Sequence, residues 1–122
     1  MAGQAGLFNI EVNQHATYNV RLTWMTTGST PAPIDTTDHI VVLQVRAEKD
    51  SPNVLYQAST GNEKIVCGGA SGHITIKIPA EDTSQMRFRE AFYDVIIKRP
   101  NGDTIRFIEG TFTVRLGVSK ID

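Results

Sequence analysis

The chain has 122 residues, of which 40% are hydrophobic and 20% charged, a composition that is ordinary for a globular domain and unlike that of disordered chains. Twelve basic residues stand against thirteen acidic ones, so no overall positive field favours nucleic acid or an anionic membrane as a partner. The length suffices for one continuous core but not for two cores with a linker. We therefore expect a single domain over residues 1–122.

No apolar run approaches the roughly 20 residues that cross a bilayer, and residues 1–6 lack the basic start and apolar stretch of a secretory signal. We expect a soluble protein that is made in the cytoplasm. The single cysteine, Cys67, cannot form an internal disulfide. Stability is therefore expected from the core and from neighbouring subunits.

Apolar and polar residues alternate over short stretches bounded by turn formers, which is the pattern of half-buried β-strands. In residues 19–24, Trp24 ends the apolar face and is expected to anchor the core. In residues 73–78, three isoleucines share one face and three polar residues share the other. Both segments are predicted strands.

Residues 40–45 are more continuously apolar, as in a central strand. Ile40 and Val42 lie on the face opposite Val41, Leu43 and Val45, so the strand carries apolar residues on both faces. In a domain of two layers, the second face either meets the segment 79–86 or is left for another subunit. Ile40 and Val42 are accordingly the candidate partner interface.

The C-terminal third predicts a meander. Residues 92–98 form one strand, and Asn101-Gly102 closes a tight hairpin because this pair adopts positive φ readily. The chain then returns as two strands, residues 104–107 and, after Glu109-Gly110, residues 111–116.

Residues 79–86 are the only helical candidate, with acidic residues early in a turn or two. Residues 26–33 and 59–62 are predicted loops, and the glycine run 68–72 is a predicted flexible connection. About seven or eight short strands at regular spacing favour an all-β, immunoglobulin-like β-sandwich with one short helical turn. An open barrel is the alternative.

The candidate chemistry is sparse. His15, His39 and His73 are far apart, and the segment 35–39, which brings two aspartates next to His39, is better explained by an Asx-type turn than by a cation site. Cys67 has no partner motif and is expected to act as a small hydrophobe. We predict no metal, no cofactor and no catalytic residue.

Two further patterns have structural explanations. The glycine run 68–72 lacks the lysine of a phosphate loop, and the adjacent Glu81 and Asp82 cannot flank a glycosidic bond from opposite sides. Basic residues interleave with aromatic ones between residues 87 and 107, as in single-strand nucleic-acid binders. Period-two placement assigns Tyr93 and Phe107 to the core set instead.

Three stretches carry a family resemblance. Residues 72–83 end a strand in Pro-Ala and a threonine-bearing turn, residues 92–97 form a Tyr-Asp strand, and residues 101–114 lead from an Asn-Gly hairpin through Glu-Gly into a last strand. Together with the polar opening strand, Leu22-Thr23-Trp24, residues 31–35 and Gln44-Val45-Arg46, they resemble small tail, baseplate and fibre-attachment proteins of tailed bacteriophages. Residues 115–120 depart from that pattern, which ends in a more regular Val-Thr strand.

The resemblance implies a virion structural subunit with no cofactor and no catalytic residues, built with other virion proteins into a symmetric homo-oligomeric assembly. A tail or baseplate adaptor is the first expectation and a capsid decoration protein the second. A carbohydrate- or surface-binding module is the alternative class, for which Trp24, Tyr18 and Tyr56 are the obvious stacking platforms.

Overall fold

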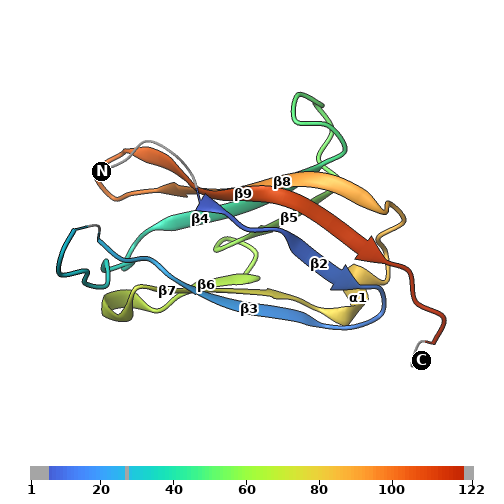
Figure 1. The fold of residues 1–122 in the computed structure, drawn as a ribbon, viewed down its shortest axis with the longest axis horizontal. Helices are drawn as coiled ribbons and strands as arrows, with labels where there is room; N and C mark the ends of the chain where they lie inside the picture. Colours follow the sequence, from blue (N-terminus) through green and yellow to red (C-terminus); the bar gives the residue numbers. More distant parts are fainter. Residues whose placement is uncertain (1–5, 27, 120–122) are drawn as a thin grey trace.

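The computed structural model describes residues 6–26 and 28–119 (Figure 1). These residues form nine β-strands, one single-turn α-helix and one 3-10 turn. In chain order the elements are β1 (Gly6–Leu7), β2 (Ile10–Asn13), β3 (Tyr18–Thr23), β4 (Ile40–Arg46), β5 (Tyr56–Ser59), β6 (Ile65–Cys67), η1 (Gly69–Ser71), β7 (His73–Ile78), α1 (Ala80–Thr83), β8 (Glu90–Lys98) and β9 (Thr104–Arg115).

The strands make two sheets that pack face to face (Figure 1). The larger sheet has the order β1-β9-β8-β4-β5, with β2 also paired to β9, and the smaller has the order β3-β7-β6. All pairs are antiparallel except those of β1 and β2 with β9, which are parallel. The predicted all-β, immunoglobulin-like sandwich is confirmed, with the short β1 and β2 bringing the strands to nine.

The last strand differs from the prediction. Instead of two strands separated at Glu109-Gly110, β9 runs without a break from Thr104 to Arg115 along β8. The register shifts once, because Val95 pairs with Ile108 whereas Ile96 pairs with Arg106. One extra residue of β9 is taken up there as a bulge, which keeps the strand continuous.

Gly110 is a point of close approach between two segments. The chain crosses from β1 to β2 beside it, where the amide of Phe8 donates to the carbonyl of Glu109 at 3.0 Å. A Cβ on Gly110 would lie 2.5 Å from the carbonyl oxygen of Phe8. The hydroxyl of Tyr93, the pairing partner of Gly110, donates to that same oxygen. The glycine therefore makes room for the crossing rather than ending a strand.

The core lies between the two sheets and is built from the inward-facing side chains, which are every second residue along each strand. The inward side chains of β4 and β7 are fully buried, as the period-two patterns predicted. The largest fully buried side chains are Phe112, Ile10, Leu43, Ile65, Ile74, Ile76, Ile78, Ile97, Val12, Val41, Val45 and Val95.

Trp24, directly after β3, is 7% exposed, so the prediction of a core anchor is confirmed. Its ring lies edge-on to His39 at 5.8 Å and 5.7 Å from the ring of Phe107. The Arg99 guanidinium caps it at 5.4 Å. The Trp24 amide donates to the carbonyl of Gly72 at 2.8 Å, and Gly72 has a φ of 74°, a conformation that suits glycine.

The predicted hairpin between β8 and β9 is also confirmed. The amide of Arg99 donates to the carbonyl of Asp103 at 2.7 Å, and the amide of Gly102 donates to the carbonyl of Arg99 at 2.9 Å. Gly102 has a φ of 97°, and the Asn101 side chain accepts from the amide of Asp103. This turn chemistry sets where β9 begins.

One end of the sandwich is closed by α1 and the residues after it, where a helical turn was predicted. Thr83 donates from its hydroxyl to the carbonyl of Ala16 at 2.9 Å, and Gln14 donates from its side chain to the carbonyl of Met86 at 2.9 Å. Met86 is buried in the core. The glycine run 68–72, predicted as a flexible connection, forms η1 and is tied to the neighbouring loop by Thr36.

We predict that Gly110→Ala destabilises the protein by about 1–3 kcal/mol, the usual cost of overpacking, because the added methyl meets the Phe8 carbonyl. Denaturant unfolding measures the change. Gly6→Ala is the matched control, since its Cβ would meet its nearest neighbour at 3.5 Å, an ordinary contact. Equal stabilities for the two variants would contradict the close approach.

We predict that Trp24→Ala lowers the free energy of unfolding by about 3–5 kcal/mol, as large core truncations do. Trp24→Phe should cost less because it keeps an aromatic ring in the same site. Tryptophan emission of the native protein should be blue-shifted and poorly quenched by acrylamide. Red-shifted, easily quenched emission would show an exposed indole.

Candidate interaction surface

The outer face of the larger sheet, turned away from the core, carries the residues predicted as a partner interface. On β4, Val41, Leu43 and Val45 are fully buried, whereas Ile40 is 52% exposed and Val42 is half-buried. The two faces of the strand therefore alternate as predicted. Val42 pairs with Ile96 of β8, which is also half-buried. We call Ile40, Val42 and Ile96 the apolar stripe.

The segment 79–86 does not cover the apolar stripe, although this was one of the two predicted possibilities. Ile40 pairs with Lys98, which pairs with Thr104 at the start of β9. The segment instead contacts residues 14–16. These residues come directly after Asn13, which pairs with Arg115 at the other end of β9. The stripe and this segment thus lie at opposite ends of the sandwich, and the stripe faces outward.

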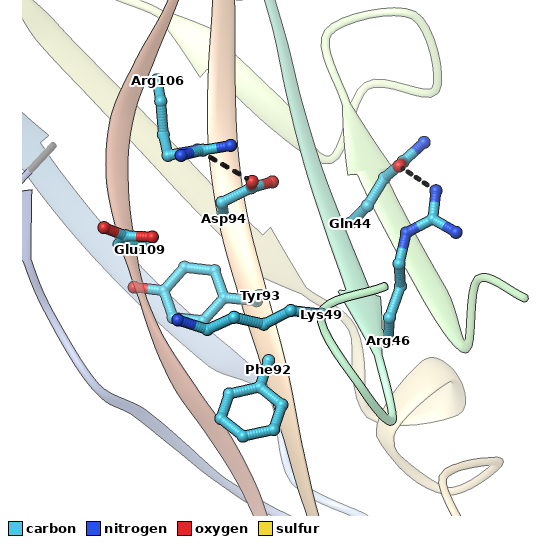
Figure 2. Close-up of a pocket in the computed structure, with 8 residues that line it drawn as sticks. All are labelled: Gln44, Arg46, Lys49, Phe92, Tyr93, Asp94, Arg106 and Glu109. Atoms are coloured by element: carbon cyan, nitrogen blue, oxygen red, sulfur yellow. Dashed lines mark hydrogen bonds and ion pairs between the residues drawn. The ribbon is translucent and has the colours of Figure 1, made fainter. Parts of the chain in front are cut away.

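Beside the apolar stripe, the same face holds a shallow polar hollow (Figure 2). Its volume of about 200 Å³ is below the roughly 300–1,000 Å³ of typical small-molecule pockets, so it resembles surface relief more than a cofactor site. The residues that line it come from β4, β8, β9 and the loop after β4: Gln44, Arg46, Lys49, Phe92, Tyr93, Asp94, Arg106 and Glu109.

The charged groups of the hollow are held by local contacts. Arg106 lies 3.2 Å from Asp94 across the β8–β9 pair. Arg46 donates to the side-chain oxygen of Gln44 at 2.9 Å, and Gln44 donates to Gln57 at 2.8 Å (Figure 2 shows the Arg106–Asp94 and Arg46–Gln44 contacts). With its side chains 57% and 32% exposed, the ion pair contributes little to folding, about 0–1 kcal/mol. Its main effect is to fix the orientation of both groups.

Lys49 and Phe92 form the other side of the hollow. The Lys49 ammonium lies 5.7 Å from the centre of the Phe92 ring, within the range of a cation–π contact. The face thus presents both signs of charge, an aromatic ring and an apolar stripe. Aromatic and arginine side chains are enriched in protein–protein interfaces, and the other charged groups of this face suit the polar rim that surrounds an interface core.

Sequence reasoning found Ile40 and Val42 but missed the remainder of this face. Period two along residues 92–98 does put Phe92, Asp94 and Ile96 opposite the core set, so the signal was present. What the sequence lacks is the register that sets Val42 against Ile96 and Gln44 against Asp94.

The aromatic residues suggested for glycan stacking are not free platforms. Trp24 is buried. Tyr56 is half-buried and donates its hydroxyl to Asp82 at 2.6 Å, and Asp82 also pairs with Lys64 at 3.1 Å. Tyr18 is half-buried on β3. Of the two aromatic residues that were assigned to the core instead of to nucleic-acid stacking, Tyr93 is buried and Phe107 is partly buried.

The segment 35–39 forms the predicted Asx-type turn. Asp35 accepts hydrogen bonds from the amide of Thr37 at 2.9 Å and from its hydroxyl at 2.6 Å. These bonds hold the pKa of Asp35 below its ordinary value. His39 is buried, and its Nδ1 lies 2.9 Å from the Thr37 carbonyl. In the ranges the structure describes, no three His, Cys, Asp or Glu side chains are grouped to hold a metal ion.

Cys67 lies half-buried on β6. Burial raises the pKa of its thiol, and a hydrogen bond with Thr36 acts in the opposite direction with a smaller effect. A raised thiol pKa reduces the thiolate fraction, which is the reactive form. The residue fits the role of a small hydrophobe. Of the other histidines, His15 lies 2.8 Å from Ser84 and His73 lies 3.1 Å from Thr23, so the three do not converge.

Comparisons with known proteins leave the class of this protein at the level of its fold. No protein-family model matches the chain, and no curated protein matches it. Among solved structures, it is similar to extracellular domains 3–5 of Drosophila OTK, with 16% identity and a TM-score of 0.35 over 96% of this chain and 34% of that chain. The chain thus spans about a third of that structure's length. No helix in the described ranges is long and apolar enough to cross a membrane.

We predict that the three tyrosines resist ionisation in the folded protein. Burial raises the pKa of Tyr18, of Tyr56, where Asp82 adds to the effect, and of Tyr93, where Tyr18 adds to it. A folded-state pKa above the unfolded value of about 10 means that this stability is present below pH 10 and is lost as the pH rises further. Tyrosinate absorbance should therefore appear together with unfolding, as followed by circular dichroism. Tyrosinate that appears near pH 10 in the folded protein would contradict this.

Proposed function

We propose that this protein is a non-enzymatic structural subunit of a tailed-phage virion, an adaptor of the tail or baseplate that packs against neighbouring subunits. The observation that carries the proposal is the outer face of the larger sheet, where the apolar stripe adjoins oriented charges. The resemblance of residues 72–114 to small phage tail proteins supplies the kind of assembly.

A sheet face suits such a role for a physical reason. Strands β4, β8 and β9 are joined by continuous ladders, so the face is rigid before any partner arrives. A rigid, preformed face loses little conformational entropy on binding, which favours affinity for a given buried area. Ile40, Val42 and Ile96 supply apolar area, while Asp94, Arg106 and Glu109 supply specificity through charge.

The first experiment asks whether the chain belongs to a virion. Phage particles are purified from a lysate of the bacterial host that produces the chain. The chain is then quantified by mass spectrometry against known structural proteins of the same particles. A fixed copy number per particle, consistent with a ring or trimer, supports the proposal. Absence of the chain from purified particles overturns it.

The second experiment tests the face itself, and we predict that Ile40→Asp with Val42→Asp lowers incorporation at least tenfold while the monomer still folds. Each buried charge would cost several kcal/mol if left unpaired in an interface. Circular dichroism and thermal unfolding check the monomer. Val66→Asp, an exposed apolar position (60%) on the other sheet, is the matched control and should incorporate normally. Normal incorporation of the double variant would remove this face from the proposal.

A further inference from the structure

The smaller sheet has one long edge without a partner strand. Its order is β3-β7-β6, and within residues 6–26 and 28–119 no strand pairs with the outer side of β3. β3 has six residues, whereas the edge strands β5 and β6 have four and three. Long open edges are the sites at which other chains add strands, and proteins commonly keep their edges short.

The register identifies which backbone groups face outward. The amide of Trp24 donates to the carbonyl of Gly72, and every second residue of β3 repeats that geometry against β7. Tyr18, Val20 and Leu22 therefore use their backbone groups within the sheet. The N–H and C=O groups of Asn19, Arg21 and Thr23 point away from β7, toward the open edge.

The side chains of β3 are also incompletely covered. Tyr18, Val20 and Leu22 face the core, yet all three are only half-buried. Their pairing partners on β7, Ile78, Ile76 and Ile74, are fully buried. The inward face is therefore shielded from water on the middle strand, β7, and partly exposed to water on the edge strand, β3. A strand added beside β3 would cover this exposed apolar area.

The charged side chains on the outward face of the smaller sheet, the face turned away from the core, are all positive. The side chains of Arg21 on β3 and Lys77 on β7 point to this face, and the three strands of the sheet contain no Asp or Glu. Arg21 lies in the middle of the open edge. A strand placed beside it would set a side chain about 4.5–5.5 Å from the Cβ of Arg21, where an opposite charge is favourable.

We propose that the edge of β3 binds an extended strand of a different protein chain, with an acidic residue opposite Arg21 and apolar residues on either side. The backbone of that strand bonds to Asn19, Arg21 and Thr23, and its apolar side chains cover Val20 and Leu22. This is strand addition, in which main-chain bonds supply affinity and alternate side chains supply specificity. The edge is separate from the apolar stripe and does not depend on the proposed virion role.

A second copy of this chain is a poor occupant. Antiparallel pairing of β3 with itself must match outward-facing residues, and the register that pairs all three of them sets Arg21 opposite its own copy. A shift by two residues sets Arg21 opposite Asn19 but pairs only two of the three, so it forms fewer backbone bonds. Like charges directly opposite each other are destabilising. The same arginine that disfavours self-pairing therefore selects for an acidic partner.

The test uses the purified full chain and two blocked peptides, Thr-Val-Glu-Val-Thr and its Lys counterpart Thr-Val-Lys-Val-Thr. Amide exchange is followed by NMR. The acidic peptide should slow exchange of the Asn19, Arg21 and Thr23 amides at least tenfold at saturation and leave the amides of Val20 and Leu22, already bonded to β7, unchanged. The Lys peptide should bind at least tenfold more weakly.

Two variants make the assignment specific. Arg21→Glu should reverse the peptide preference without loss of the fold. Arg21→Pro removes an outward N–H that the ladder with β7 does not use, so it should fold and lose peptide binding, whereas Arg21→Thr keeps the N–H and should bind the acidic peptide with only the charge effect lost. Protection at other amides, no protection at millimolar peptide, or an unchanged preference in Arg21→Glu would overturn the proposal. None of these results depends on whether the chain is found in virions.

Discussion

The structure depends on the way the N-terminal segment is held against β9. Phe8 lies at the crossing from β1 to β2, where its carbonyl accepts from the Tyr93 hydroxyl and passes over Gly110. This crossing lets both short strands pair with β9 in parallel, so they extend the larger sheet. Because β1 and β2 pair with β9, no strand within residues 6–26 and 28–119 lies on the outer side of β3. The close approach of Phe8 to Gly110 thus accompanies the pairing that gives the larger sheet its six strands.

The candidate interaction surface of the larger sheet also depends on strand pairing. β8 is a central strand because it pairs with both β9 and β4, and its pairing with β4 brings Val42 and Ile96 side by side. The bulge between Val95 and Ile96 in the β8–β9 register brings Arg106 and Glu109 to the same face as Asp94. The apolar stripe and the polar hollow are consequences of strand register, since neither is contiguous along the chain.

Two kinds of contact are available to such a domain, and they differ in energetics. A sheet face binds by excluding water from side chains, so affinity comes mainly from apolar area and is tuned by charge. A sheet edge binds by completing backbone hydrogen bonds and depends on strand register. The protein carries one candidate of each kind on different sheets, Ile40 with its neighbours and the edge of β3. A subunit with two independent surfaces can join two different neighbours, which is what an adaptor requires.

Much of the fold was determined by local pattern. Period two in residues 73–78, 40–45 and 92–98 identified three strands and their buried faces, because alternation of side chains needs no knowledge of the partner strand. Asn101-Gly102 identified its hairpin because turn chemistry is a local preference, and of the pair Gly102 takes the positive φ. The Asx turn at Asp35 likewise closes through its own near neighbours.

The tertiary structure decided what depends on contacts between distant segments. Gly110 looked like a strand break because glycine is a turn former, and only the approach of Phe8, about a hundred positions earlier, explains it as a space for backbone. The alternation in residues 19–24 predicted Trp24 as a core anchor, but the residues that enclose it, His39, Phe107 and Arg99, are known only from the tertiary structure. The open edge of β3 has no sequence signal at all. Whether a strand is central or at an edge is set by where its neighbours pair, and that pairing is a long-range property.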